Sequence, residues 1–128
     1  MNDTARPKIA LIAHDGKKLE LIRFAQINSE TLKRYTLIAT GTTGQRLQEE
    51  VGLDIERVLS GPLGGDAQIA AQVVTGLITA VLFIVDPMFA QPHEPDIQSL
   101  QRLCNVHNVP LATNLAAAQL ILDGLSRR

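Results

Sequence analysis

Short apolar runs that alternate with helical patterns constrain the fold of this chain more than any other feature. The runs lie at residues 8–13, 35–40, 55–60, 80–86 and 109–114, and the run at 55–60 is weaker than the others. The other four are near-continuous apolar stretches, which is typical of strands covered on both faces. Helices between such strands act as crossovers that leave consecutive strands parallel. The sequence therefore predicts an α/β fold with a parallel sheet.

Two helical patterns are clear in the second half of the chain. The first has apolar residues at helical spacing and a glycine, Gly76, placed to end it. Its apolar residues are Ile69, Ala70, Val73, Val74 and Leu77. The second follows Asp96, a residue type that suits an N-cap, and comprises Ile97, Leu100, Leu103 and Cys104. With 128 residues, of which 45% are hydrophobic, the chain fits one globular domain spanning residues 1–128.

Charge and hydropathy exclude several classes of protein. The formal net charge of −1 gives no general attraction to nucleic acid or to an anionic membrane. The longest apolar run, residues 80–85, is far shorter than a membrane span, and the first eight residues lack the apolar core of a signal peptide. A single cysteine allows no internal disulfide. These features predict a cytoplasmic protein.

Residues that bind anions or transfer protons gather after the predicted strands. The segments that follow the first four strands read HDGKK, TGTTG, SGPLGGD and DPMFAQPHEPD. Two of the three histidines, His14 and His93, lie in these segments. Ligands of parallel α/β sheets bind at the carboxyl ends of the strands. We therefore expect the functional site at that edge of the sheet.

The segment TGTTG at residues 40–44 is a candidate phosphate site. A helix predicted to begin near Gln45 would present backbone N–H groups, and the threonine hydroxyls would add neutral donors. Lys17 or Lys18 could add positive charge. A turn with a threonine N-cap explains the same residues equally well. The spacing matches neither a P-loop nor a dinucleotide-binding motif, so nucleotide binding is not indicated.

Asp66 and His93 are the candidate proton-transfer groups. Asp66 ends a glycine-rich segment at the start of a helix, where it could cap the helix or act as a base. Prolines stiffen the loop that carries His93, and the carboxylate of Asp96 could fix the tautomer of that histidine. Helix capping alone also accounts for Asp96. His14 and Asp15 are second-rank candidates, placed where a substrate carbonyl would lie if phosphate occupied the threonine segment.

The candidate residues together indicate one kind of chemistry. No HxxxH, HxH or CxxC spacing indicates a metal site, and Ser60 lacks the GxSxG context of a hydrolase nucleophile. A carboxylate base, a neutral imidazole and a phosphate cradle suit proton removal next to the carbonyl of a small phosphate ester. The resulting enediolate could be reprotonated, as in an isomerase, or could expel phosphate, as in a lyase. The residues leave this choice open.

The same segments resemble, in the same order, the motifs of methylglyoxal synthases. They read IALIAHDGKK, LIATGTTG, LSGPLGGDAQIAA and VDPMFAQPHEPDIQSLQRLCNVHNVPLATN, within residues 8–118. The resemblance implies a single-domain, three-layer fold with a five-stranded parallel sheet in a flavodoxin-like strand order. It also implies a lyase that converts dihydroxyacetone phosphate to methylglyoxal and inorganic phosphate without metal or organic cofactor. The implied assembly is a homohexamer. Inorganic phosphate, the product, is also an expected inhibitor.

Carried over by motif, the resemblance assigns roles to individual residues. Asp66 matches the carboxylate that removes the proton, His93 the proton shuttle, and Asp96 and Asp15 the supporting acids. Asp86 matches an acid at the same edge of the sheet, whose role is less defined. The residues matched to substrate and phosphate binding are His14, Lys18, Thr40, Gly41, Thr42, Thr43, Ser60 and Gly61. Longer family members carry a phosphate-binding arginine beyond the last helix. Arg127 or Arg128 could take its place here, or Lys18 and the threonine segment could suffice without it.

One alternative comes from a different functional class. Domains of the same fold also serve as non-catalytic modules that sense phosphate or nucleotide effectors. Such a module would need the phosphate cradle but has no use for Asp66 and His93 together. Because both are present, the sequence favours the enzyme.

Overall fold

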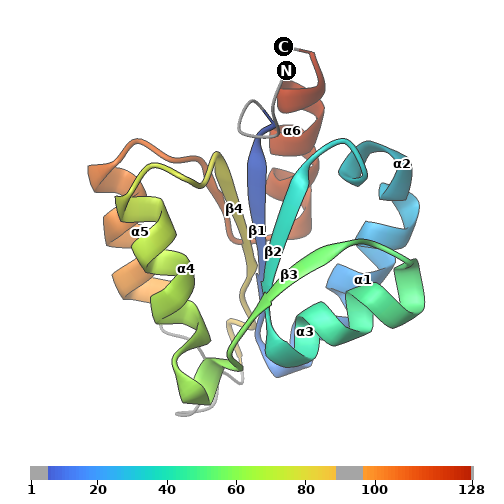
Figure 1. Cartoon of the computed structure of the whole chain (residues 1–128), viewed down its shortest axis with the longest axis horizontal. Helices are drawn as coiled ribbons and strands as arrows, with labels where there is room; N and C mark the ends of the chain where they lie inside the picture. The colour runs from blue at the N-terminus through green and yellow to red at the C-terminus, as the bar shows by residue number, and fades with distance from the viewer. Residues whose placement is uncertain (1–5, 89–96, 128) are drawn as a thin grey trace.

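A computed structural model describes residues 6–88 and 97–127 and contains a five-stranded parallel sheet (Figure 1). The strands, which coincide with the five apolar runs, are β1 (Lys8–Ala13), β2 (Thr36–Thr40), β3 (Ile55–Val58), β4 (Ala80–Ile84) and β5 (Leu111–Ala112). Every neighbouring pair is parallel. The predicted α/β class and five-stranded parallel sheet are therefore confirmed.

Helices cover both faces of the sheet, which makes three layers (Figure 1). The helices are α1 (Lys18–Ile27), α2 (Ser29–Leu32), α3 (Gly41–Arg46), α4 (Gly65–Val74), α5 (Ile97–Val106) and α6 (Leu115–Ser126). Short helical segments are η2 (Asp15–Lys17), η3 (Leu47–Val51) and η4 (Gly61–Leu63). Helices α4 and α5 pack on one face, and α1, α3 and α6 pack on the other. Within residues 6–88 and 97–127, no helix is long and apolar enough to cross a lipid bilayer.

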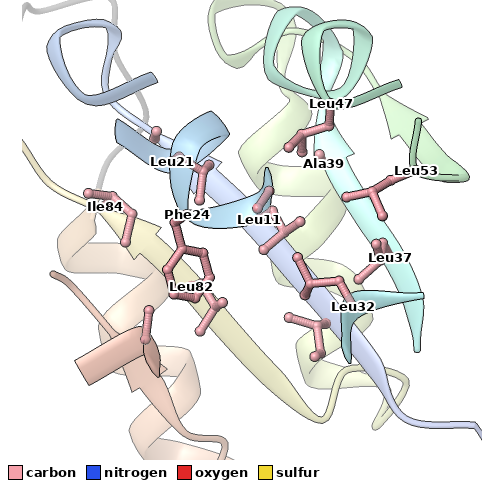
Figure 2. Packing of buried hydrophobic residues seen from close by; sticks show 14 of the residues in the cluster. Leu11, Leu21, Phe24, Leu32, Leu37, Ala39, Leu47, Leu53, Leu82 and Ile84 are labelled. Carbon is pink, nitrogen blue, oxygen red and sulfur yellow. The ribbon is translucent and has the colours of Figure 1, made fainter. Parts of the chain in front are cut away.

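Successive residues of the central strand β1 enter opposite hydrophobic cores. Ile9 and Leu11 belong to the core beneath α1 and α6, which Figure 2 shows, whereas Ala10 and Ile12 belong to the core beneath α4 and α5. All four side chains are fully buried. Because both faces of the strand are covered, its sequence is apolar throughout and does not alternate. The edge strand β3 exposes Glu56 and Arg57, which explains its weaker pattern.

The strand order differs from the expected flavodoxin-like order. The sheet runs β3-β2-β1-β4-β5, whereas the flavodoxin-like order is 2-1-3-4-5. Here the chain adds two strands on one side of β1 before it crosses to β4 on the other side. The reversal therefore lies between β1 and β4, and the segments after β1, β2 and β3 share one half of the carboxyl edge. Ligands of such sheets bind beside the reversal.

The two helices predicted in the second half of the chain are present. Helix α4 ends before Gly76, which adopts a left-handed conformation at φ 79° as expected for a helix-terminating glycine. Helix α5 buries Leu100 and Cys104, and this burial raises the pKa of the Cys104 thiol. The proposed N-cap of α5, Asp96, lies outside the described residues.

The helix expected near Gln45 begins earlier than predicted. Its first residue is Gly41, and Thr40 occupies the N-cap position with extended backbone angles. The segment TGTTG is thus the end of β2 and the first turn of α3, not a loop before the helix. Helical backbone continues through η3, so that residues 41–51 form one helical stretch.

Candidate active site

The candidate residues lie where β1, β2, β3 and β4 end, at the edge of the sheet where α1, α3 and α4 begin (Figure 1). Backbone hydrogen bonds join these segments: the His14 N–H donates to the Ile84 oxygen at 3.1 Å, and the Gly41 N–H donates to the Leu59 oxygen at 3.3 Å. The described candidates are His14, Asp15, Lys18, Thr40, Gly41, Thr42, Thr43, Ser60, Gly61, Asp66 and Asp86. The remaining two, His93 and Asp96, lie outside the described residues.

The ring of His14 is buried, and contacts with Phe83 and with the backbone of Asp86 orient it. Only 2% of the residue is exposed, and the ring meets Phe83 edge-on at 5.2 Å between centroids. Its Nδ1 accepts a hydrogen bond from the Asp86 backbone N–H at 2.9 Å. An Nδ1 that accepts cannot carry the proton, so the neutral ring has its proton on Nε2. His14 is therefore suited to donate a hydrogen bond from Nε2 to a substrate oxygen.

Asp15 and Lys18 form an ion pair across the turn after β1. The Lys18 Nζ lies 2.8 Å from the Asp15 Oδ1, and the lysine side chain is 20% exposed whereas that of the aspartate is 58% exposed. Lys17 instead pairs with Glu20 on α1 at 3.4 Å. The two lysines therefore have different partners, and Lys18 is the one held by an acid of the candidate site.

The N-cap and the first turn of α3 contain two buried threonines. Thr40 and Thr43 are 6% and 1% exposed, respectively. Among the described residues, the Oγ1 of Thr43 is a fully buried side-chain oxygen with no hydrogen bond. Buried hydroxyls without a partner are destabilising and therefore uncommon. Together with the N–H groups of a helix start, which have no partner within the helix, this hydroxyl suits an anion that supplies oxygen acceptors.

A tight turn connects β3 to α4 and carries Ser60 and Gly61. The Ser60 carbonyl accepts hydrogen bonds from the N–H groups of Leu63 and Gly65, both at 3.0 Å. A Cβ at Gly65 would overlap the Leu59 carbonyl oxygen, so this position has no room for a side chain. A Cβ at Gly41 would lie 3.1 Å from the Ser60 nitrogen. The start of α3, the turn and the start of α4 are therefore packed backbone against backbone.

Asp66 lies in the first turn of α4 and is half-buried. The N-cap is Gly64, at φ 102°, and Asp66 is the second residue of the helix. The expectation that Asp66 caps the helix is therefore wrong, because the preceding glycines make the turn without a side-chain cap. A carboxylate in the first helical turn is still stabilised in its ionised form by the helix dipole.

Asp86 contacts the backbone of neighbouring turns at the end of β4. Its Oδ1 accepts a hydrogen bond from the Met88 N–H at 3.0 Å. Its Oδ2 approaches Gly16 so closely that a Cβ there would overlap it. Since the Asp86 N–H also holds His14, Asp86 connects the segments after β4 and β1.

Arg127 does not lie at this edge of the sheet. It follows α6, which runs from the carboxyl end of β5 to the opposite end of the molecule, where the chain termini lie (Figure 1). The idea that Arg127 replaces the family's phosphate-binding arginine within its own chain is therefore wrong, and Arg128 lies outside the described residues. Within the described part of the chain, no three His, Cys, Asp or Glu residues are grouped to hold a metal ion.

Two residues that contact the site were not found from the sequence. Phe83 packs on His14, and the Oε1 of Gln68 accepts a hydrogen bond from the Leu59 N–H at 2.7 Å. Phe83 reads as an ordinary buried strand residue, and Gln68 as an ordinary polar helix residue. No motif marks Gln68 because its partner is a backbone group.

Most of the chain matches known proteins of one family. A family model described as an MGS-like domain matches residues 20–113. Methylglyoxal synthase from Thermus thermophilus is 60% identical over 114 residues, which cover 89% of this chain and 90% of the relative. Methylglyoxal synthase from Cupriavidus taiwanensis is 58% identical over 122 residues, which cover 95% of this chain and 92% of the relative.

A solved structure resembles the fold closely. The crystal structure of methylglyoxal synthase from Elizabethkingia anophelis superimposes with a TM-score of 0.89 at 47% identity. The match covers 91% of this chain and 77% of the other chain. The resemblance inferred from four sequence motifs thus extends over most of the chain, which belongs to the methylglyoxal synthase family.

Proposed function

We propose that this protein is a methylglyoxal synthase that converts dihydroxyacetone phosphate to methylglyoxal and inorganic phosphate. The observation that carries the proposal is the buried Thr43 hydroxyl, which has no hydrogen bond within residues 6–88 and 97–127 and lies at the same sheet edge as the half-buried Asp66. The hydroxyl suits a phosphate oxygen, and the carboxylate suits proton removal. The names and high identity of the relatives support the same activity.

The first chemical step is the removal of a proton from the carbon that bears the substrate hydroxyl. Asp66 accepts this proton, and the electron pair left on carbon moves onto the carbonyl oxygen to give an enediolate. A hydrogen bond from the Nε2–H of His14 to that oxygen would stabilise the developing charge. His93, supported by Asp96, is proposed to move protons between the substrate oxygens, as the family resemblance implies.

The second step is the elimination of phosphate. A proton first passes from the hydroxyl of the deprotonated carbon to the enediolate oxygen, and the oxygen left without its proton forms the aldehyde carbonyl. The electrons of the existing carbon–carbon double bond then form a new double bond to the phosphate-bearing carbon, the bridging C–O bond breaks, and the bond electrons leave with inorganic phosphate. The organic product, an enol, gains a proton at its terminal carbon, loses its hydroxyl proton as the ketone carbonyl forms, and becomes methylglyoxal. The atoms and electrons balance without an oxidant or a reductant.

Hydrogen-bond donors are proposed to hold the phosphate. The hydroxyls of Thr42, Thr43 and Ser60 and the backbone of Gly61 would supply neutral donors. Gly41, whose N–H donates to the Leu59 oxygen, would let the backbone approach the phosphate closely. Thr40, the N-cap residue of α3, would position the first turn of that helix at the end of β2. Lys18 would supply a positive charge that Asp15 orients at 2.8 Å. We also propose a homohexameric, cytoplasmic enzyme that phosphate inhibits, which size measurement and inhibition assays would test.

The decisive experiment follows methylglyoxal and phosphate from dihydroxyacetone phosphate in metal-chelated buffer. We expect both products in equal amounts. An Asp66→Asn variant should lose at least about 10²-fold in turnover, the scale of a positioned acid–base group, and should still bind inorganic phosphate. Phosphate binding by the wild-type protein without any turnover would favour an effector-sensing domain. Near-normal turnover in Asp66→Asn would exclude Asp66 as the base.

A further inference from the structure

The side chain of Gln68 ties helix α4 to the end of strand β3. Its Oε1 accepts a hydrogen bond from the Leu59 N–H at 2.7 Å, while its own backbone N–H donates to the Gly64 oxygen at 3.1 Å. Gln68 lies two residues after Asp66, and Leu59 directly precedes Ser60. One side chain therefore links the helix of the proposed base to the proposed phosphate-binding turn.

The backbone of Leu59 is also fixed through its carbonyl group. The Leu59 oxygen accepts a hydrogen bond from the Gly41 N–H at 3.3 Å. The same oxygen packs against the Cα of Gly65 so closely that a Cβ there would overlap it. The starts of α3 and α4 thus both contact the backbone of Leu59, and the contact from Gln68 is made by its side chain. Because that contact can be removed without changing the backbone, it can be tested separately.

We propose that Gln68 is a positioning residue that holds Ser60 and Gly61 at a fixed position relative to Asp66. The inference rests on the proposed function. Phosphate leaves the enediolate only when the bridging C–O bond stands out of the enediolate plane, whereas proton removal has no such requirement. The phosphate-binding turn sets that angle. Loosening the turn relative to Asp66 should therefore slow elimination more than proton removal.

The fold should tolerate the loss of this hydrogen bond. Gln68 is exposed and Leu59 is 50% exposed, so water can take over the N–H of Leu59. Gln68→Met keeps the length of the side chain without a strong acceptor, and Gln68→Glu keeps an Oε acceptor. Gln45→Met is a matched control, because Gln45 is an exposed helical glutamine whose side chain bonds to Glu49 on the same helical stretch.

The experiment measures two rates on each protein in D₂O. One rate is methylglyoxal formation, and the other is deuterium incorporation into the remaining dihydroxyacetone phosphate, which reports proton removal followed by reprotonation. For Gln68→Met we expect kcat for methylglyoxal to fall about 10-fold, a modest fraction of what ångström-scale misplacement can cost, and KM to change less. Deuterium incorporated per methylglyoxal formed should rise. Gln68→Glu should recover most of kcat, and Gln45→Met should match the wild type.

Four results would overturn the inference. A wild-type ratio of deuterium to product in Gln68→Met would show that the two steps are not separated by this contact. An equal loss of both rates, with lowered thermal stability, would assign Gln68 a merely structural role. The same loss in Gln68→Glu as in Gln68→Met would exclude the acceptor oxygen as the cause. A wild-type protein without turnover would overturn the proposed function, and this inference with it.

Discussion

Replacing Thr43 with valine should stabilise the protein and weaken its phosphate binding. Valine has nearly the same shape as threonine and a similar helix propensity, so the change removes the hydroxyl alone. That hydroxyl is buried without a hydrogen-bond partner among the described residues, which costs about 1–3 kcal/mol in other proteins. We take the lower end, about 1 kcal/mol, as the expected gain in the free energy of unfolding.

The expected gain is large enough to measure. With an unfolding entropy of about 2.1 cal/mol/K per residue, 1 kcal/mol raises the Tm of a chain of this length by about 4 °C. If phosphate loses one hydrogen bond worth about 1.4 kcal/mol, its Kd rises about tenfold. At a phosphate concentration of 100 times the wild-type Kd, the ligand stabilises the wild type by about 2.7 kcal/mol and the variant by only about 1.4 kcal/mol. At this phosphate concentration the variant should therefore be no more stable than the wild type.

The assay is thermal and urea unfolding in buffer without phosphate and again with phosphate, together with calorimetric titration of phosphate. Thr75→Val is the control, since the Thr75 hydroxyl is exposed and donates to the Ala71 oxygen at 2.9 Å. The control should lose up to about 1 kcal/mol equally with and without phosphate. If Thr43→Val were destabilised to the same extent as the control without phosphate, the hydroxyl would have a partner in the free protein. Unchanged phosphate affinity would exclude it as a ligand.

Two further changes test the packing and the charges around the sheet. Gly65→Ala should lower the free energy of unfolding by about 1–3 kcal/mol because the new Cβ overlaps the Leu59 oxygen. The control Gly124→Ala in α6, where a Cβ meets open space, should raise it by up to about 1 kcal/mol. If urea unfolding ranked the two variants the other way, the packing at the turn would be contradicted. The hydrogen bond from Lys8 holds the pKa of Glu56 below its usual value. The stability that ionised Glu56 contributes is therefore present above the ordinary glutamate pKa and is lost as pH falls through the lower pKa of the folded state. Glu56→Gln should therefore lower the free energy of unfolding at pH 7 by less than about 1 kcal/mol, since the side chain of Glu56 is 45% exposed. The difference between variant and wild type should shrink toward pH 3. A difference that stayed constant with pH would show that the carboxylate charge is not its cause.

The sequence was a good guide wherever both faces of an element are buried. Strands β1 and β4 read as continuous apolar runs because alternate residues enter two different cores. Helix α4 was recognisable from its apolar spacing and from Gly76, whose left-handed conformation ends it. The candidate site residues followed from the same reading, because the ends of parallel strands meet at one edge of the sheet.

Strand order and the start of α3 could not be obtained in that way. Hydrophobic periodicity says which residues are buried but not which strands are neighbours, since β1 would be equally apolar beside β3 or β4. The start of α3 was misplaced because Gly and Thr have low helix propensity and read as loop residues. Contacts between the start of α3 and the backbone at Leu59 and Ser60 override that preference. Gln68 was missed because its partner is a backbone N–H, which leaves no pattern in the sequence.

The arrangement also explains how a chain with a net charge of −1 could hold a phosphate dianion close to a carboxylate. Each anion has its own helix start: the proposed phosphate site is at the first turn of α3, and Asp66 is in the first turn of α4. Lys18 is already paired with Asp15, so its charge is partly neutralised before phosphate binds. Neutral donors and helix dipoles must therefore carry much of the attraction. Such donors act at short range and in fixed directions. Phosphate binding therefore depends on how well the backbone of Leu59, which contacts both helix starts, keeps them in place.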